Sequence, residues 1–332
     1  MLLLQSRNHK QAKNCNIKSP YIKMKEIDYQ ARKRIKNLFA NNDFNDCVLY
    51  ENDLYMPRMF EQKLKIIKNF ELREDDIWIV TYPKCGTTWT QELVWTLAND
   101  VDLEKAKMPL YIRSPWIDSL PPFMNENGDV LDSVDYISNM KERRIIKSHL
   151  PLEFLPDEIL EKCKVVYVAR NPKDVAVSFY HHQKNIPLHG YLGTFEEFMD
   201  FFYKGLLHYG NYWHHILGAW NKRSDKNLKF LWYEDMKTDQ MIVIEELCDF
   251  LQHPLTNDKK AKLLKHVQFE NMKSNPFSSP APTAFLDQSI FFRKGSVGDW
   301  QNYFDKTKAK QLEDWIQNNV SGTGLEKLQQ FQ

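Results

Sequence analysis

The stretch T-Y-P-K-C-G-T-T-W at 81–89 carries residue types that can hold an anion. Gly86 allows backbone amides to approach an anion closely, and the hydroxyls of Thr87 and Thr88 can donate hydrogen bonds to it. Lys84 adds a full charge and precedes the turn, where it could reach the oxygen that bridges a terminal group to a phosphate. The stretch predicts a phosphate loop that also stabilises a leaving group. An ordinary strand-to-helix turn with a solvated lysine is the alternative.

A second group of reactive residues lies in the segment K-S-H-L-P at 147–151, which directly follows Arg144 and the apolar pair Ile145-Ile146. Lys147 and His149 are two residues apart, so on a strand their side chains point to the same face. A cation and an imidazole on one face suit a site that deprotonates a nucleophile beside an anion. The alternative is a histidine that only caps the strand end.

Two further segments could bind a second phosphate. Arg170 follows the run 164–169 and Ser178 lies two turns into the next helix, where Asn171 is a natural N-cap,. Pairing of Arg170 with Asp174 is the competing interpretation. Near the C-terminus, the segment 293–300 reads R-K-G-S-V-G-D-W, in which two cations and two glycines form a loop suited to wrap an anion,.

The elements that must position these residues alternate in type. Apolar β-rich runs at 77–80, 144–151, 164–169 and 228–233 alternate with segments of helical periodicity,. This order is typical of an α/β fold, in which functional side chains gather at the carboxyl ends of parallel strands. We see no internal boundary, so the sequence predicts one domain over 43–332, with a P-loop-like central parallel sheet flanked by helices. The basic stretch 1–42 is expected to be a flexible arm.

The totals restrict the class of partner. Among 332 residues, 45 are basic and 44 acidic, which predicts no nucleic-acid or membrane partner,. The five cysteines show no C-x-x-C pairing, so we expect reduced thiols, a cytoplasmic location and no zinc site,. No signal peptide or spanning stretch is expected. The histidines of the central region are expected to pack rather than to bind a metal; they are His181, His182, His208, His214 and His215.

Five segments in this order resemble the cytosolic sulfotransferase family. They are T-Y-P-K-C-G-T-T-W at 81–89, K-S-H-L-P at 147–151, V-V-Y-V-A-R-N-P-K-D-V-A-V-S at 165–178, L-W-Y-E-D-M-K at 231–237 and R-K-G-x-x-G-D-W at 293–300. The resemblance runs from about residue 45 to about residue 318. It implies a donor, 3'-phosphoadenylyl sulfate (PAPS), and a product, the 3',5'-bisphosphate PAP, with no metal.

The resemblance also implies residue roles. The donor-binding set is Lys84, Cys85, Gly86, Thr87, Thr88, Trp89, Arg170, Ser178, Tyr233, Phe269, Met272, Arg293, Lys294 and Gly295. The catalytic set is His149 as general base, Lys84 on the bridging oxygen, Lys147 on the transferring group, and Ser178. The acceptor-binding set is Trp116, Lys147, His149 and His182. The acceptor is expected to be a small hydrophobic phenol, sterol, retinoid or similar compound, in a pocket that the aromatic loops at 108–140 and a lid-like stretch at 274–292 help to form.

The sequence departs from the family in two places. Gln268 stands where a small hydroxyl residue usually precedes Phe269. The segment that usually forms the family's dimer is replaced, with Gln301, Asp305, Lys306 and Lys310 in its place. A homodimer stays possible, but its usual motif is absent.

Three other functions remain open from the sequence. A dehydratase of the retinol type would sulfate an allylic alcohol and then eliminate the sulfate with the same residues. An idle binder of nucleotides or hydrophobic compounds would keep the fold, although Lys84, Lys147, His149 and Ser178 together argue against it. A kinase is disfavoured because G-x-x-x-x-G-K-[ST] does not occur,.

Overall fold

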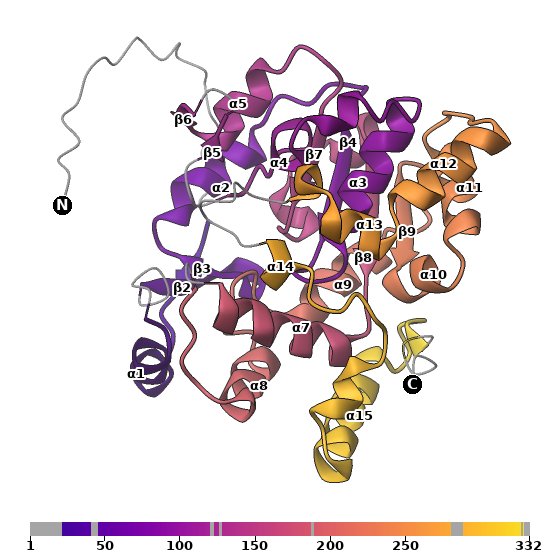
Figure 1. Ribbon diagram of the computed structural model, residues 1–332. Coiled ribbons are helices and arrows are strands. Elements are labelled where there is room, and N and C mark those ends of the chain that lie inside the picture. Colours follow the sequence, from indigo (N-terminus) through magenta and orange to yellow (C-terminus); the bar gives the residue numbers. More distant parts are fainter. Residues whose placement is uncertain are drawn as a thin grey trace, which may run out of the picture.

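A four-stranded parallel sheet forms the centre of the protein, in a computed structural model that describes residues 22–40, 46–119, 123–125, 128–186, 189–279, 288–326 and 328 (Figure 1). The strand order is β7-β4-β8-β9. The strands are β4 (Ile77–Thr81), β7 (Ile145–Ser148), β8 (Lys164–Ala169) and β9 (Leu228–Trp232). All pairs are parallel, with Val80 opposite Ser148 and Thr81 opposite Val168. The predicted α/β fold and its strands are confirmed.

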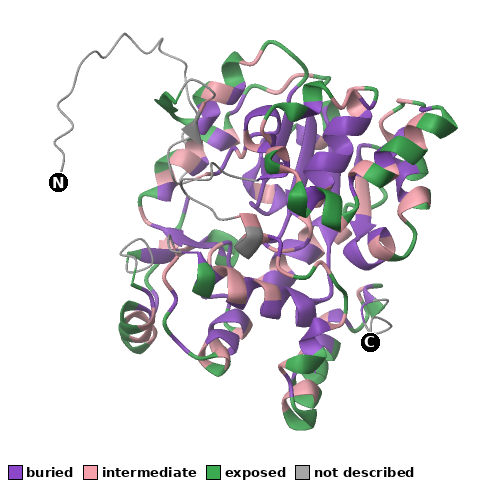
Figure 2. Cartoon of the chain, viewed as in Figure 1, coloured by how far each residue is buried: buried purple, intermediate pink, exposed green. Residues whose placement is uncertain are grey.

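The sheet is buried on both faces because its strands are apolar at nearly every position (Figure 2). Successive side chains point to opposite faces. Trp78 and Val80 of β4 therefore join one core cluster, while Ile77 and Ile79 join the other. The second cluster includes α3 (Thr87–Ala98), α11 (Gln240–Phe250) and α12 (Asn257–His266), and the first includes α7 (Pro172–Asn185) and α9 (Tyr212–Trp220).

Helix starts follow local capping chemistry. The side chain of Asn171 accepts from the backbone N–H of Lys173 at 3.0 Å, and Pro172 opens α7, as the sequence predicts,. Thr194 and Glu197 form a reciprocal capping box at the start of α8 (Phe195–Tyr203),. The short helix α10 (Tyr233–Thr238) follows β9 directly.

The first described residues form structure within the stretch 1–42 that the sequence analysis expects to be a flexible arm. Strand β1 (Met24–Lys25) pairs with β2 (Cys47–Tyr50), which pairs with β3 (Tyr55–Pro57). Helix α1 (Tyr29–Leu38) is capped by Asp28 and buries Ile35. The apolar residues between the lysines and arginines of this stretch therefore fix residues 22–40 to the domain, and residues 1–21 lie outside the described part.

The remaining elements cover the sheet and its edges. The helices are α2 (Phe60–Lys68), α4 (Leu110–Arg113), α5 (Ser133–Asn139), α6 (Ile159–Lys162), α13 (Phe269–Ser274), α14 (Gln288–Phe291) and α15 (Lys306–Val320), and strands β5 (Phe123–Met124) and β6 (Val130–Leu131) pair with each other. Short 3-10 helices span Glu51–Asp53, Lys105–Lys107, Leu152–Phe154, Pro276–Ser278 and Asp299–Asn302. None of the helices in the described ranges is long and apolar enough to cross a membrane.

Candidate active site

The predicted phosphate loop joins β4 to α3. Gly86 is the N-cap of α3 with φ of 97°, and Lys84 also has a left-handed backbone, with φ of 69°. A Cβ on Gly86 would lie 2.6 Å from a ring carbon of Tyr233, so the position requires glycine for both its conformation and its contact,. Thr87 and Thr88 open the helix, where N–H groups lack intrahelical partners,. The loop has the geometry of an anion site at a helix N-terminus.

Lys84 lies in a positively charged and largely apolar environment. Its Nζ is 3.5 Å from Nδ1 of His182 and 4.2 Å from the centre of the Phe291 ring. Burial, together with the charges of Lys147, Arg170 and Arg293, lowers the pKa of Lys84 to about 7. These cations repel one another. A ligand with several negative charges would reduce this repulsion by binding between them.

His149 is held in one tautomer by the end of β4. Its Nδ1 lies 2.9 Å from the main-chain oxygen of Thr81, and a carbonyl oxygen can only accept, so Nδ1 carries the proton,. Nε2 therefore has the free lone pair. Burial lowers the pKa of His149 well below its usual value, and the neighbouring charge of Lys147 acts in the same direction. The imidazole is neutral at physiological pH and can accept a proton at Nε2.

The acceptor-side residues named from the sequence lie together. Nζ of Lys147 is 4.3 Å from the Trp116 ring centre, and the Trp116 and His149 rings meet edge to face at 5.5 Å. His182 reaches the same group through Lys84. Burial lowers the pKa of Lys147 to about 8, while the charge of Asp118 acts in the opposite direction. Of the lid-like stretch, residues 280–287 lie outside the described part of the chain.

A further cation, Arg170, contacts the main chain of the phosphate loop. The guanidinium of Arg170 donates from Nη1 to the main-chain oxygen of Lys84 at 3.2 Å and from Nη2 to that of Ser296 at 3.0 Å. It also lies 4.2 Å from the centre of the Tyr233 ring. Its Nε is buried and has no hydrogen-bond partner among the described residues, as expected for a donor that awaits an anionic ligand,. Ser178 is half-buried in α7.

Arg293 and Lys294 share one carboxylate. Nη1 of Arg293 and Nζ of Lys294 each lie 2.6 Å from an oxygen of Asp299. Burial raises the pKa of Asp299, but the hydrogen bonds from Lys294, Asn302 and Arg293 outweigh it and hold this pKa at about 2. The cluster of two cations and one carboxylate has a net charge of +1. Asp299 holds the two cations together without a bound ligand.

The competing pairing of Arg170 with Asp174 contributes little. Nη2 of Arg170 is 3.9 Å from the nearest Asp174 oxygen. The buried carboxylate of Asp174 instead accepts from the backbone N–H of Gly298 at 2.7 Å and of Trp300 at 3.1 Å. Asp174 therefore fixes the loop 293–300 to the start of α7, which is a long-range contact that local capping rules do not reveal.

Aromatic side chains pack beside Arg170 and beside the loop 293–300. Trp89 and Tyr233 meet edge to face at 5.6 Å. Gly295 has φ of 61°, and a Cβ there would lie 2.2 Å from the Phe269 ring, so the loop packs directly on that ring. Met272 of the same helix is buried, and Gln268 is the N-cap of α13 without a side-chain capping bond.

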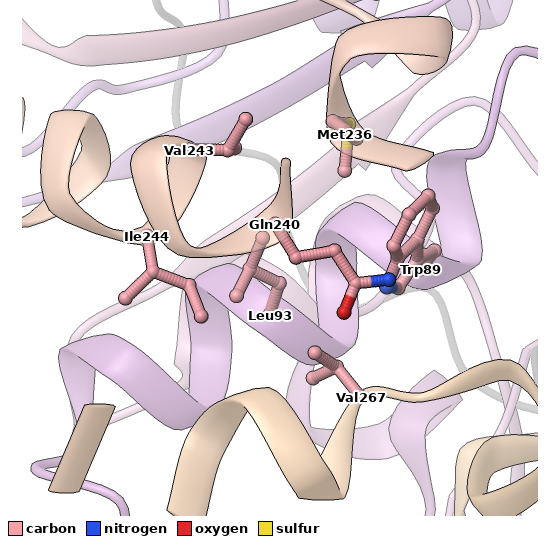
Figure 3. A pocket seen from close by; sticks show the side chains of 7 residues that line it. All are labelled: Trp89, Leu93, Met236, Gln240, Val243, Ile244 and Val267. Carbon is pink, nitrogen blue, oxygen red and sulfur yellow. The ribbon is translucent and has the colours of Figure 1, made fainter. Parts of the chain in front are cut away.

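The back of Trp89 faces a narrow apolar hollow, shown in Figure 3. Its lining comes from α3, α10, α11 and the residue after α12: Trp89, Leu93, Met236, Gln240, Val243, Ile244 and Val267. Most of these side chains are aliphatic and buried, so the hollow beside the Trp89 ring is apolar.

Cys85 lies inside the phosphate loop but is not reactive. Burial raises the pKa of its thiol well above the usual range, so it stays protonated,. In the described part of the chain, no group of three or more His, Cys, Asp or Glu side chains could hold a metal ion.

Several neighbours of the site residues are not predicted by the sequence. Asp118 accepts from the backbone N–H of His149, and His215 contacts the main-chain oxygen of His149 at 2.9 Å. His189 lies 3.1 Å from His182, nitrogen to nitrogen. The main-chain oxygen of Thr81 and the carboxylate of Asp299 complete this group. These contacts come from residues distant in sequence or from backbone atoms, and motif spacing carries no signal for them.

The comparisons with known proteins agree with this arrangement. The family model described as "Sulfotransferase domain" matches residues 74–331. Mouse sulfotransferase 1B1 is 38% identical over 266 residues, which are 78% of this chain and 87% of the relative. The crystal structure of retinol dehydratase with retinol and PAP superposes with a TM-score of 0.81 at 29% identity, and covers 92% of this chain and 98% of the other.

A second structure of retinol dehydratase, with androsterone and inactive cofactor PAP, gives a TM-score of 0.79 at 28% identity and covers 92% and 97% of the two chains. The resemblance inferred from the five segments is thereby confirmed over most of the chain. The protein belongs to the sulfotransferase family, and its activity is sulfuryl transfer.

Proposed function

We propose that the protein transfers the sulfuryl group of PAPS to a hydroxyl or amine of a small hydrophobic acceptor. The observation that carries the proposal is the meeting of Lys84, Lys147 and a neutral His149 beside a phosphate loop. The two retinol dehydratase structures, which hold PAP with retinol or androsterone, support both the donor and the size of the acceptor.

The donor is expected to span the two cationic groups. The 5'-phosphosulfate would bind at Lys84, Cys85, Gly86, Thr87, Thr88 and Trp89, and the 3'-phosphate at Arg170, Ser178, Arg293, Lys294 and Gly295. The adenine would lie among Trp89, Tyr233, Phe269 and Met272. The unpartnered Nε of Arg170 and the further cations Arg293 and Lys294 support a ligand with more than one phosphate,.

The reaction needs one proton transfer and one displacement. Nε2 of His149 takes the proton of the acceptor hydroxyl, and the acceptor oxygen attacks sulfur as the bond from sulfur to the bridging oxygen breaks. Lys84 neutralises the charge that grows on the bridging oxygen, which leaves with PAP, and Lys147 neutralises the transferring group. The protonated imidazole then releases its proton to solvent. Ser178 helps to hold the donor in line.

Elimination is the second candidate. The two retinol dehydratase structures superpose at TM-scores of 0.79 and 0.81, against 0.67 for mouse sulfotransferase SULT7A1 with PAP. With an allylic alcohol, the same site would form a sulfate ester that then loses sulfate and a carbon-bound proton to give an additional C=C bond. The acceptor-side residues Trp116 and His182 are compatible with both outcomes.

Location and assembly are also expectations. The described cysteines Cys47, Cys85, Cys163 and Cys248 are buried and form no disulfides, which supports a cytoplasmic protein,. The altered segment after Trp300 disfavours the family's usual dimer. Light scattering that showed a compact dimer, lost when Asp305 and Lys306 are substituted, would contradict that expectation.

The deciding experiment is transfer of radiolabelled sulfate from PAPS to a panel of phenols, sterols and retinol, with a PAP titration beside it. Transfer to any member supports the proposal, and chromatography of the retinol product separates a sulfate ester from an alkene. Tight PAP binding without transfer to any acceptor would favour the idle binder.

A further inference from the structure

We propose that Asp118 is a positioning residue of this site, which holds the main chain of His149 and supplies the negative charge that keeps Lys147 cationic beside the transferring group. The inference rests on the proposed roles of His149 and Lys147 and adds a residue to them.

The segment 115–118 runs alongside β7 as a short parallel neighbour. The N–H of Lys147 donates to the main-chain oxygen of Pro115 at 2.9 Å, and the N–H of Ile117 donates to that of Lys147 at 3.0 Å. This pairing places Trp116 opposite Lys147. Two residues further along both segments, Asp118 comes opposite His149.

The carboxylate of Asp118 is fully buried, and both of its oxygens lie 3.2 Å from the backbone nitrogen of His149. On the other side of the same residue, Nε2 of His215 donates to the main-chain oxygen of His149 at 2.9 Å, and Tyr167 OH lies 2.6 Å from Nδ1 of His215. With the contact from Nδ1 to Thr81, the backbone and ring of His149 are fixed at three points. The direction of the Nε2 lone pair is thereby fixed as well.

Burial raises the pKa of Asp118, and hydrogen bonds with Ser148, Trp116, Tyr209 and the backbone N–H of His149 act in the opposite direction. Burial lowers the pKa of Lys147 and the charge of Asp118 raises it, so an ionised Asp118 favours the charged form of Lys147,. The other titratable groups that face them are Tyr209 and the neutral rings of His149 and His182. Lys84 also faces them, and its pKa of about 7 means that it carries either a positive charge or none. Among these groups Asp118 is the source of negative charge.

The test compares the wild type with Asp118→Asn and Asp118→Glu, using purified full-length protein, PAPS and the best acceptor of the panel. Asparagine keeps an acceptor oxygen for His149 N–H but removes the charge, whereas glutamate keeps the charge. Asp76→Asn is the matched control, because Asp76 is a fully buried carboxylate that pairs with Arg144 at the other end of β4 and β7.

We expect Asp118→Asn to lower kcat about tenfold and to move the alkaline limb of the rate profile to lower pH by about one unit, with PAP affinity within about threefold of wild type. Asp118→Glu should retain the position of the alkaline limb even if its rate falls. Asp76→Asn should lower thermal stability without moving the limb. The pH at which the rate falls is obtained from relative rates within one preparation. A fraction of misfolded, inactive protein therefore does not change it.

An Asp118→Asn enzyme with the wild-type rate and limb would overturn the proposal, and so would an equal shift in Asp76→Asn. Failure of the base assignment is seen separately: His149→Ala would then keep its activity, whatever the Asp118 variants do.

Discussion

Nδ1 of His149 donates to the main-chain oxygen of Thr81, the last residue of β4, at 2.9 Å. The same strand continues into the phosphate loop, so the orientation of the base and the position of Lys84 depend on one strand end. Because a backbone oxygen cannot be mutated away, this contact fixes the tautomer of His149 independently of the side chains around it. Proton acceptance at Nε2 is the chemical consequence.

Replacing His149 tests the base directly. His149→Ala should lower kcat by about 10² to 10⁴, the usual contribution of a positioned general base, and leave PAP binding close to wild type. His149→Asn can keep a hydrogen bond to Thr81 through its amide N–H but cannot accept a full proton, so it should be equally inactive. Steady-state rates and a PAP titration measure the two effects. Near-normal transfer by either variant would rule out the base role.

The low pKa values of the two lysines predict uptake of a proton when PAP binds. Burial and neighbouring cations lower the pKa of Lys84 to about 7, so at pH 8 it is largely neutral in the free protein. Phosphates nearby favour its charged form, so binding at pH 8 should take up about one proton. Calorimetry in two buffers of different ionisation enthalpy measures this number. Equal binding enthalpies in both buffers would contradict it.

The same values set the pH dependence. Since Lys84 and Lys147 must be cations, kcat/KM for PAPS should fall above about pH 7 to 8,. The low pKa of His149 predicts no acid limb until well below pH 6.5.

The free energy of unfolding should depend on pH in the opposite direction. A lysine whose pKa is lowered in the folded state takes up a proton on unfolding, so protonation favours the unfolded chain. The free energy of unfolding should therefore increase from about pH 7, the folded pKa of Lys84, up to its unfolded pKa of 10.5,.

The sequence could predict the parts of the site that local chemistry determines. Asn171, Pro172 and the β4 loop act within a few residues, and their strand and helix boundaries are confirmed. The positions of Lys84 and His149 at strand ends followed from the alternation of strands and helices. Asp118 and His215 could not be found in this way, because their contacts depend on which segments the fold brings beside His149. The structure of residues 22–40 was missed because a high lysine and arginine content hid a short apolar face around Ile35.

The contact between Gly295 and Phe269 can be tested with a neighbouring glycine as control. Gly295→Ala places a Cβ 2.2 Å from the Phe269 ring, whereas Gly298→Ala meets nothing within 4 Å. Both glycines have a positive φ, so both variants should lose about 1–2 kcal/mol of stability from the backbone,. Only Gly295→Ala should also weaken PAP binding, by about tenfold or more, because the ring or the loop must move. Equal PAP affinities would show that the Phe269 wall does not contribute to the donor site.

The final prediction concerns the shape of the Arg170 guanidinium. Arg170 donates to two main-chain oxygens, of Lys84 and Ser296, and its Cζ lies 4.2 Å from the centre of the Tyr233 ring. A lysine keeps the charge but has no planar fork to span both loops, so Arg170→Lys should weaken PAP binding by about 2 kcal/mol or more. Arg293 makes one ion pair, with Asp299, which a lysine can replace, so Arg293→Lys should cost much less. Titration of PAP into both variants measures the difference. If the two substitutions weakened binding equally, the charge of Arg170 alone would explain its role. Its contacts with the main chains of Lys84 and Ser296 would then not contribute to PAP binding.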